Sequence, residues 1–237
     1  MSTVPLLQLD EVSVGVGETP ICHEVSLTIQ EGETHVLLGP NGSGKSSLLH
    51  AIMGVGPFTV TGGKILFRGK DITDMDVTER AKSGVGMAFQ RPPKMPGVTV
   101  SQLAAAMHAE PAVARAAETL RLGHLHDREV NCGFSGGETK RWEIMKLLLQ
   151  KPDLCLFDEP ESGVDLEHVA VVGHAVQELL KEPGSAGARG ALIVTHTGFI
   201  LDHVDATIAH LMVAGRIVDS GDPRELFERI RLHGYHT

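Results

Sequence analysis

Residues 34–54 read THVLLGPNGSGKSSLLHAIMG, and the expectation for the whole chain starts from this stretch. A short apolar strand runs into a glycine-rich loop, and the apolar residues of KSSLLHAIMG recur at helical spacing. The loop matches G-x-x-x-x-G-K-[ST] from Gly39 to Ser46, in the strand-loop-helix setting that binds phosphates. Its glycines let the backbone curl, so that the amides of residues 41–46 form a concave anion site. The stretch therefore predicts a polyphosphate site.

Two side chains of this loop have distinct expected roles. The Lys45 ammonium is expected to bridge the β- and γ-phosphates, and the Ser46 hydroxyl to complete a Mg²⁺ shell. An ordinary glycine-rich turn is the alternative, but a chance match in a chain of this length arises on the order of once in a hundred. The residues expected to hold the phosphates are Gly39, Pro40, Asn41, Gly42, Ser43, Gly44, Lys45, Ser46 and Ser47.

Apolar strands run into polar side chains at three other places. The strand LCLFD ends in Asp158 and Glu159, and a buried strand tolerates charge only at its exit. We expect Asp158 to anchor Mg²⁺, directly or through water, and Glu159 to act as general base on the attacking water; a helix cap is the alternative. Gln90 follows VGMAF and His196 follows ALIVT, at the edge where open parallel sheets bind ligands. Both side chains are expected to contact the γ-phosphate or the attacking water, and Gln90 is also expected to be a Mg²⁺ ligand. The alternative is that each side chain only makes hydrogen bonds within its own loop.

A second helix start offers another anion site. The residues Phe134-Ser135-Gly136-Gly137-Glu138 begin the helix SGGETKRWEIMKLLLQ, so their amides and hydroxyl face an anion as the first loop does. The chain thus carries two helix starts suited to phosphate.

The order of elements predicts an α/β fold. Strands and helices alternate after Phe134, which indicates a parallel sheet covered by helices. At the N-terminus, LLQLDEVSVGV and HEVSLTI alternate with period two and predict an antiparallel hairpin. Between the N-terminal strands and Phe134, the segments VSQLAAAMHA and AVARAAETLRL have apolar residues at helical spacing. We expect one domain over residues 1–237, with the core and β-subdomain in 1–90 and 135–237 and a helical insert at about 91–134.

Composition narrows the possible partners. The chain has 237 residues, with 21 Lys and Arg against 30 Asp and Glu and a formal net charge of −9. This balance gives nucleic-acid binding no general electrostatic support. No apolar run approaches the ~18 residues of a membrane-spanning helix, and the N-terminus lacks a basic start followed by an apolar stretch. We expect neither nucleic-acid binding nor direct membrane insertion, and a cytoplasmic location.

Taken together, these motifs resemble the nucleotide-binding domain of an ABC ATPase, a class of P-loop NTPase, over nearly the whole chain. The motifs are GPNGSGKS at 39–46, FQ at 89–90, FSGGE at 134–138, LCLFDEP at 154–160, SGVD at 162–165 and TH at 195–196. The resemblance implies ATP and Mg²⁺ as cofactors and a nucleotide-dependent homodimer closing head to tail. Ser135 and Gly137 of one copy, with Gly136 between them, would then cap the ATP held on Lys45 of the other. It also implies that Asp165 crosses the interface, although an N-cap role for this residue is nearly as well supported.

Within the superfamily, the chain looks more like SufC, the ATPase of iron–sulfur cluster scaffolds, than like a transporter subunit. The segments concerned are GPFTVTGGKILFRGKDIT, ERAKSGVGMAFQRPP with MPGV, NCGFSGGETKRWEI, ESGVD and GRIVDSGD with a terminal Gly234-Tyr235. The resemblance implies a partner similar to the SufB or SufD scaffold proteins. The alternative is the ATP-binding subunit of a membrane transporter, with a permease as partner; the sequence DEP favours it. A nucleotide sensor without turnover is disfavoured by Glu159 and His196.

Two smaller expectations concern a lysine and the nucleotide base. Lys140, two residues past Glu138, is expected to pair with Glu159 in the resting state. Residues 1–38 contain no Phe, Tyr or Trp, so base recognition by an aromatic residue upstream of the phosphate loop is not expected.

Overall fold

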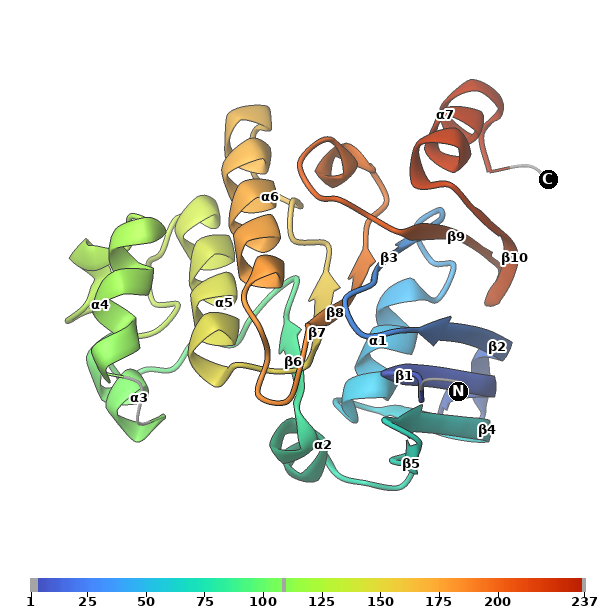
Figure 1. The fold of residues 1–237 in the computed structure, drawn as a ribbon, viewed down its shortest axis with the longest axis horizontal. Helices are drawn as coiled ribbons and strands as arrows, with labels where there is room; N and C mark the ends of the chain where they lie inside the picture. Colours follow the sequence, from blue (N-terminus) through green and yellow to red (C-terminus); the bar gives the residue numbers. More distant parts are fainter. Residues whose placement is uncertain (1–3, 108–109, 236–237) are drawn as a thin grey trace.

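The computed structural model describes residues 4–107 and 110–235, and within them two β-sheets are flanked by helices (Figure 1). The larger sheet has six strands in the order β10-β9-β3-β8-β7-β6. Neighbouring strands from β9 to β6 are parallel, and β10 pairs antiparallel with β9. This confirms the predicted parallel sheet. The strands are β3 (Thr34–Leu38), β6 (Val85–Ala88), β7 (Leu154–Asp158), β8 (Gly190–Val194), β9 (Ile208–Val213) and β10 (Arg216–Gly221).

The second sheet is antiparallel and has the order β2-β1-β4-β5. Its first two strands form the expected hairpin, in which Leu7 pairs with Ile29 and Leu9 with Leu27. These apolar positions turn inward because successive strand residues face opposite sides. The third strand begins at Phe58, where residues 58–60 pair with β1. The strands are β1 (Leu7–Val16), β2 (Thr19–Ile29), β4 (Phe58–Phe67) and β5 (Lys70–Asp71).

Helix α1 (Lys45–Met53) lies between the two sheets. Its neighbouring residues Leu48 and Leu49 are both fully buried, because the helix contributes to a core shared with strands of both sheets. Gly44 precedes the helix with φ of 101°, a left-handed conformation that glycine adopts without strain. The phosphate loop is therefore fixed by a buried strand before it and a buried helix after it.

The other face of the six-stranded sheet is covered by helices, with a second core beneath them. They are α5 (Gly136–Gln150), α6 (Leu166–Lys181), the 3₁₀ helix η2 (Phe199–Asp202) and α7 (Pro223–His233). With helices on both faces, ligands can reach the sheet at the carboxyl ends of its strands.

Residues 91–134 contribute α3 (Val100–Ala106), α4 (Glu110–Thr119) and the 3₁₀ helix η1 (Gly123–Leu125), which lie apart from the sheets in Figure 1. Together with α5 they form a third core. Trp142 of α5 lies within it and is 1% exposed. A tryptophan beside the second anion site therefore serves the packing of the helical insert onto α5. His108 and Ala109, in the stretch predicted to be helical, lie outside the described residues.

Helix α2 (Val77–Ser83) was not predicted. It is short and largely exposed, and its one clear sequence signal is the capping box of Asp76 and Glu79. Its single buried side chain in the structure, Arg80, donates to the carbonyls of Ala51 and Ile52 at 2.6 and 2.8 Å. The helix therefore completes the C-terminal end of α1.

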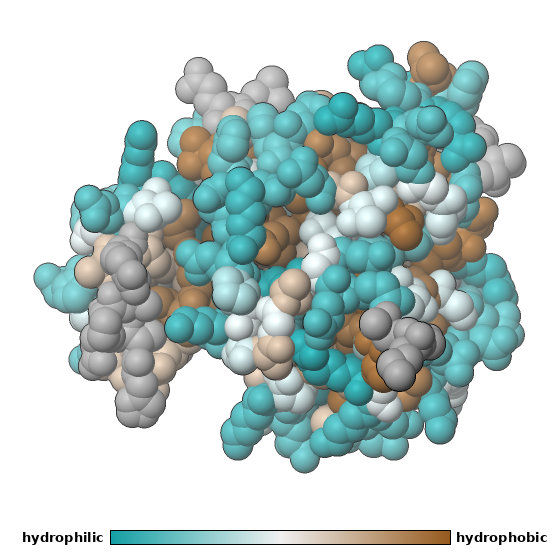
Figure 2. All heavy atoms as spheres, in the orientation of Figure 1, coloured by the Kyte–Doolittle hydropathy of each residue, from teal (hydrophilic) through white to brown (hydrophobic). Residues whose placement is uncertain are grey.

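The face of the molecule in Figure 2 is largely hydrophilic, with hydrophobic residues in small separate areas. Among the described residues, the helices fall short of the length and hydropathy that crossing a bilayer requires.

Candidate active site

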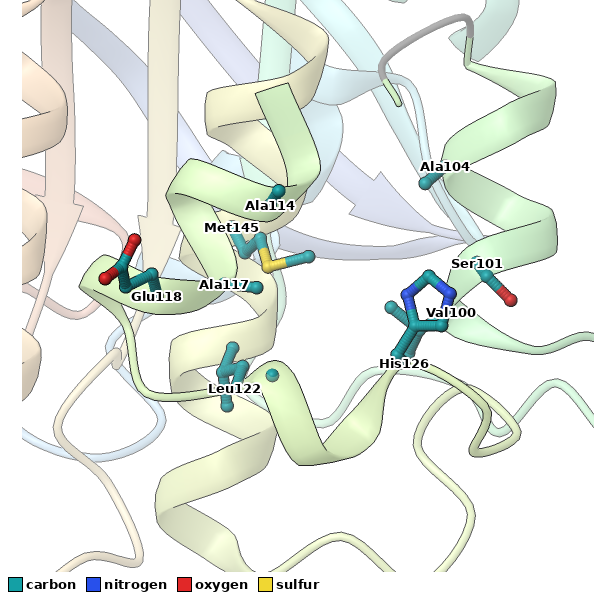
Figure 3. Close-up of a pocket in the computed structure, with 10 residues that line it drawn as sticks. Val100, Ser101, Ala104, Ala114, Ala117, Glu118, Leu122, His126 and Met145 are labelled. Atoms are coloured by element: carbon teal, nitrogen blue, oxygen red, sulfur yellow. The ribbon is translucent and has the colours of Figure 1, made fainter. Parts of the chain in front are cut away.

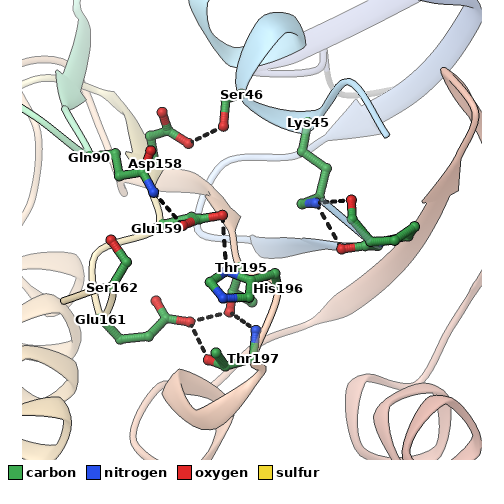
Figure 4. Close-up of polar contacts among 12 residues, drawn as sticks. Lys45, Ser46, Gln90, Asp158, Glu159, Glu161, Ser162, Thr195, His196 and Thr197 are labelled. Atoms are coloured by element: carbon green, nitrogen blue, oxygen red, sulfur yellow. Dashed lines mark hydrogen bonds and ion pairs between the residues drawn. The ribbon is translucent and has the colours of Figure 1, made fainter. Parts of the chain in front are cut away.

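The loop between β3 and α1 forms the predicted cradle and has no room for larger side chains at its start. A Cβ atom on Gly39 would lie 2.1 Å from the carbonyl oxygen of Met212. Lys45 is 4% exposed, and its Nζ donates to the carbonyls of Gly39 at 2.7 Å and Pro40 at 2.8 Å (Figure 4). Burial lowers the pKa of Lys45, and the nearby Glu159 and Asp158 oppose that shift. To bind a phosphate, Nζ would exchange these carbonyls for phosphate oxygens.

Ser46 and Asp158, both expected to be Mg²⁺ ligands, lie in contact, one from α1 and the other from the end of β7. The Ser46 hydroxyl donates to Asp158 Oδ1 at 2.6 Å. Asp158 is 2% exposed, and burial raises its pKa because the charged carboxylate has lost water. Nε2 of His50 lies 3.9 Å from the other carboxylate oxygen. A hydroxyl and a desolvated carboxylate are oxygen donors that suit Mg²⁺, so the residues present fit this ion.

Glu159, Gln90 and His196 come together although they follow three different strands. Gln90 Nε2 donates to Glu159 Oε2 at 2.5 Å, and His196 Nδ1 lies 3.0 Å from Oε1 (Figure 4). Glu159 has φ of 46°, an uncommon backbone conformation for a residue with a side chain. The three residues meet because β6, β7 and β8 are parallel neighbours that end at one edge. One carboxylate oxygen of Glu159 therefore accepts a hydrogen bond from Gln90, and the other lies close to His196 Nδ1 without hydrogen-bond geometry.

The second anion site lies at the exposed start of α5. The Ser135 side chain accepts from the N–H of Glu138, and the Glu138 side chain accepts from the N–H of Ser135. Two hydrogen bonds lower the pKa of Glu138 to about 2: the larger effect comes from the main-chain N–H of Ser135 and the next from the side chain of His124. A Cβ on Gly136 would lie 3.0 Å from the carbonyl oxygen of Gly163, so this glycine permits close packing.

A cleft of about 700 Å³ connects the two anion sites with the residues around Glu159. Asn41 of the phosphate loop and Gly136 of the second anion site both line it. Between them lie Gln90, Glu159 and His196. The cleft therefore brings a phosphate site, a carboxylate with fixed partners and a second anion site to one space.

Comparison with known proteins agrees with this geometry. The family model described as ABC transporter matches residues 22–162, more than half of the chain. The chain belongs to the ABC ATPase family. As a member of that family it binds nucleotide, hydrolyses ATP and works with other subunits.

The relatives of this ABC ATPase include a SufC protein and ABC transporter ATP-binding proteins. It is 36% identical to the probable ATP-dependent transporter SufC of Escherichia coli (strain K12), over 97% of each chain. It is also 36% identical to an uncharacterised ABC transporter ATP-binding protein of Methanocaldococcus jannaschii, covering 96% of this chain and 93% of that protein. Among solved structures, an ATP-binding cassette of an ABC transporter in its ADP conformation matches with a TM-score of 0.78 and 25% identity, covering 98% and 96% of the two chains.

Lys140 of the ABC ATPase contacts Glu159, as expected. Its Nζ donates to the main-chain carbonyl of Glu159 at 3.0 Å. The same nitrogen donates to the carbonyl of Gln90 at 3.0 Å and to the Ser162 hydroxyl at 3.3 Å. Lys140 therefore joins α5 to the loops after β6 and β7. Burial lowers its pKa.

Glu161 was not predicted. It is 4% exposed, and its Oε1 accepts from the hydroxyls of Thr195 and Thr197, the residues on either side of His196. Burial raises the pKa of Glu161. Its position two residues after Glu159 was the one available sequence signal, but the hydroxyl contacts depend on the pairing of β7 with β8.

Asp165 serves as the N-cap of α6 in the ABC ATPase. Its side chain accepts from the N–H of His168 at 3.0 Å and lies 2.6 Å from His168 Nδ1. The side chain is 69% exposed, so the cap leaves part of it accessible to a second molecule.

A separate cavity of about 650 Å³ lies within the helical insert (Figure 3). Its walls include Val100, Ala104, Ala117, Leu122 and Met145. Glu118 and His126 are the titratable residues among those that line it. This cavity is lined mostly by apolar side chains, so the cleft at Glu159 is the candidate active site.

Proposed function

We propose that the ABC ATPase hydrolyses Mg-ATP between two copies of itself, with Glu159 as general base. The arrangement of Gln90, Glu159 and His196 beside Ser46 and Asp158 carries this proposal. Glu159 accepts the proton of the attacking water, while Gln90 and His196 orient the carboxylate and contact the water or the γ-phosphate. Lys45 and the loop amides hold the phosphates.

Ser46 and Asp158, with Gln90, would hold Mg²⁺. The ion supplies charge neutralisation on the phosphates when it is bound with ATP. The 2.6 Å contact between Ser46 and Asp158 supports this assignment because it brings two oxygen donors together beside the loop.

Dimerisation completes the proposed site. Ser135 and Gly136 are exposed at the start of α5, where unpaired amides favour an anion. In the proposed dimer these residues and Gly137 cap the ATP of the other copy, and Asp165 contacts the other copy from the α6 cap. Hydrolysis then lets the two copies separate, so that the cycle moves whatever is attached to them.

We further propose that the attached partner is an iron–sulfur cluster scaffold of the SufB or SufD kind, and that the protein works in the cytoplasm. The SufC-like segments and the 36% identity to a SufC protein support this. The second candidate is the ATP-binding subunit of a membrane transporter. The sequence Asp158-Glu159-Pro160 and the relatives named as transporter ATP-binding proteins favour it.

Affinity purification of the tagged chain tests this choice. Source cells are lysed and their membranes are dissolved in mild detergent, so that soluble and integral membrane partners are equally available. The Lys45→Ala chain, purified in parallel with and without ATP, distinguishes nucleotide-linked partners from background. Stoichiometric recovery of a soluble scaffold supports the SufC-like proposal. Recovery of an integral membrane protein in its place overturns it in favour of the transporter subunit.

A further inference from the structure

The terminal pair Gly234-Tyr235 has no assigned role in the proposed mechanism, yet it reaches the active site. The Tyr235 hydroxyl donates to the main-chain carbonyl of His196 at 3.0 Å, across 39 residues of sequence. Tyr235 is the single tyrosine of the chain. It is half-buried and packs beside the core beneath α7.

Helix α7 carries Tyr235 to this position and is itself anchored. Leu226 is 1% exposed in the core, and Ile230 packs against the same cluster one turn later. Gly234 follows the helix with φ of 74°, where a residue with a side chain would be strained, and its N–H donates to the carbonyl of Ile230 at 2.8 Å. The chain therefore turns sharply at Gly234, and Tyr235 leaves the helix in a fixed direction.

A second contact joins α7 to the same turn. A Cβ on Gly198 would lie 2.2 Å from the Phe227 ring, so the ring lies directly over this glycine. Gly198 has φ of 72° and is two residues from His196. Phe227 and Tyr235 thus contact the 196–198 turn at two separate points.

The same turn is also fixed by Glu161, which accepts hydrogen bonds from the hydroxyls of Thr195 and Thr197. The main chain around His196 is therefore held by several contacts, while the His196 side chain remains 33% exposed and lies 3.0 Å from Glu159. Fixing the main chain of a residue restricts the directions its side chain can take.

We propose that Tyr235 is a positioning residue for His196, acting through the hydrogen bond to its carbonyl. The bond holds the turn so that Nδ1 of His196 meets the carboxylate of Glu159. This inference rests on the proposed function, because it assumes that His196 contributes to turnover.

The decisive variant is Tyr235→Phe, which removes the hydroxyl and keeps the ring. Loss of one hydrogen bond should lower kcat roughly three- to tenfold in a phosphate-release assay, while KM and nucleotide affinity change by less than about twofold. A packing defect would instead lower the melting temperature. Leu232→Ala, at a residue that is 71% exposed on the same helix, is the matched control and should match the wild type. Unchanged kcat in Tyr235→Phe overturns the inference.

A double-mutant cycle with His196→Ala separates this inference from the proposed function. If Tyr235 acts through His196, Tyr235→Phe has no further effect on kcat once His196 is removed. If Tyr235→Phe lowers kcat equally in both backgrounds, Tyr235 acts elsewhere and the inference is wrong. If His196→Ala alone leaves kcat unchanged, the proposed role of His196 fails, and the positioning role fails with it.

Discussion

The chain has two anion sites, the phosphate loop and the start of α5. They differ in how many of the groups needed to bind a phosphate one copy of the chain supplies. The phosphate loop is backed by a buried strand and a buried helix, and two of its polar side chains already have partners: Lys45 donates to the loop carbonyls and Ser46 to Asp158. The start of α5 is exposed at Ser135, whose hydroxyl accepts from the N–H of Glu138 in the capping box.

This difference indicates where each site obtains its ligand. The loop has a cation, a hydroxyl and a carboxylate within the same chain, so it can bind a nucleotide alone. The α5 start has amides and a hydroxyl and faces solvent, and in the proposed dimer its phosphate comes from the nucleotide of the other copy. Variants that disable one site while sparing the other test this distinction.

Glu159→Gln should give the largest effect. The amide cannot accept a proton, so turnover falls roughly 10²- to 10⁴-fold, while ATP binding at the loop persists and the closed dimer accumulates. Phosphate release measures the first effect, and size-exclusion chromatography with ATP measures the second. Glu178→Gln, at an exposed residue of α6 paired with Lys181, is the control. Normal turnover in the Glu159→Gln chain would remove Glu159 from the mechanism.

Lys45→Ala should disable the first site at its binding step. Loss of a charged donor to the phosphates lowers nucleotide affinity by roughly 10- to 100-fold. Titration with a fluorescent ATP analogue measures it, with Lys181→Ala as the control, since that lysine lies at the exposed end of α6. Equal affinities in the Lys45→Ala chain and the wild type would show that the loop amides suffice.

Gly136→Asp should disable the second site and spare the first. A carboxylate at a helix N-terminus favours folding but repels a phosphate, so we expect turnover to fall by at least about tenfold with loop affinity unchanged. Gly136→Ala adds the same Cβ without the charge and separates repulsion from the close approach to Gly163.

Mixing Gly136→Asp with Glu159→Gln then locates the second site. In a mixed dimer, the Gly136→Asp copy keeps its own Glu159 and meets an intact α5 start from the other copy. One working site is therefore rebuilt from two inactive chains. Partial recovery of turnover on mixing supports capping between copies, whereas no recovery places both anion sites within one chain.

The local part of the site could be predicted from the sequence. Strand-end residues such as Asp158, Gln90 and His196 follow from the alternation of elements, and parallel strands bring their ends to one edge. The phosphate loop is contiguous, so its spacing alone defines it. Helix α2 was not predicted because it is short and polar and has no apolar periodicity. Its stability depends on the tertiary contacts of Arg80.

The long-range part could not be predicted. Glu161 reaches Thr195 across 34 residues and Tyr235 reaches His196 across 39, and neither contact has a periodic signal. The contact between Lys140 and Glu159 was predicted, but the sequence does not indicate that the main-chain carbonyl of Glu159 is the acceptor.

The preference for one nucleotide base over another should be the smallest effect, because the phosphate loop contacts phosphates and has few groups that could contact the base. Stacking on an aromatic ring contributes about 1–3 kcal/mol, yet residues 1–38 contain no aromatic side chain among Phe, Tyr and Trp. Near Gly44, β2 presents Ile21 and Cys22, and the Cys22 thiol donates to the Gly44 carbonyl at 3.5 Å. We therefore expect GTP to compete with ATP within a few-fold.

Competition is measured in the Glu159→Gln chain, where hydrolysis does not deplete either nucleotide. Strong preference for ATP would mean that a group outside the loop reads the base, and the second copy of the proposed dimer would then be the first place to look.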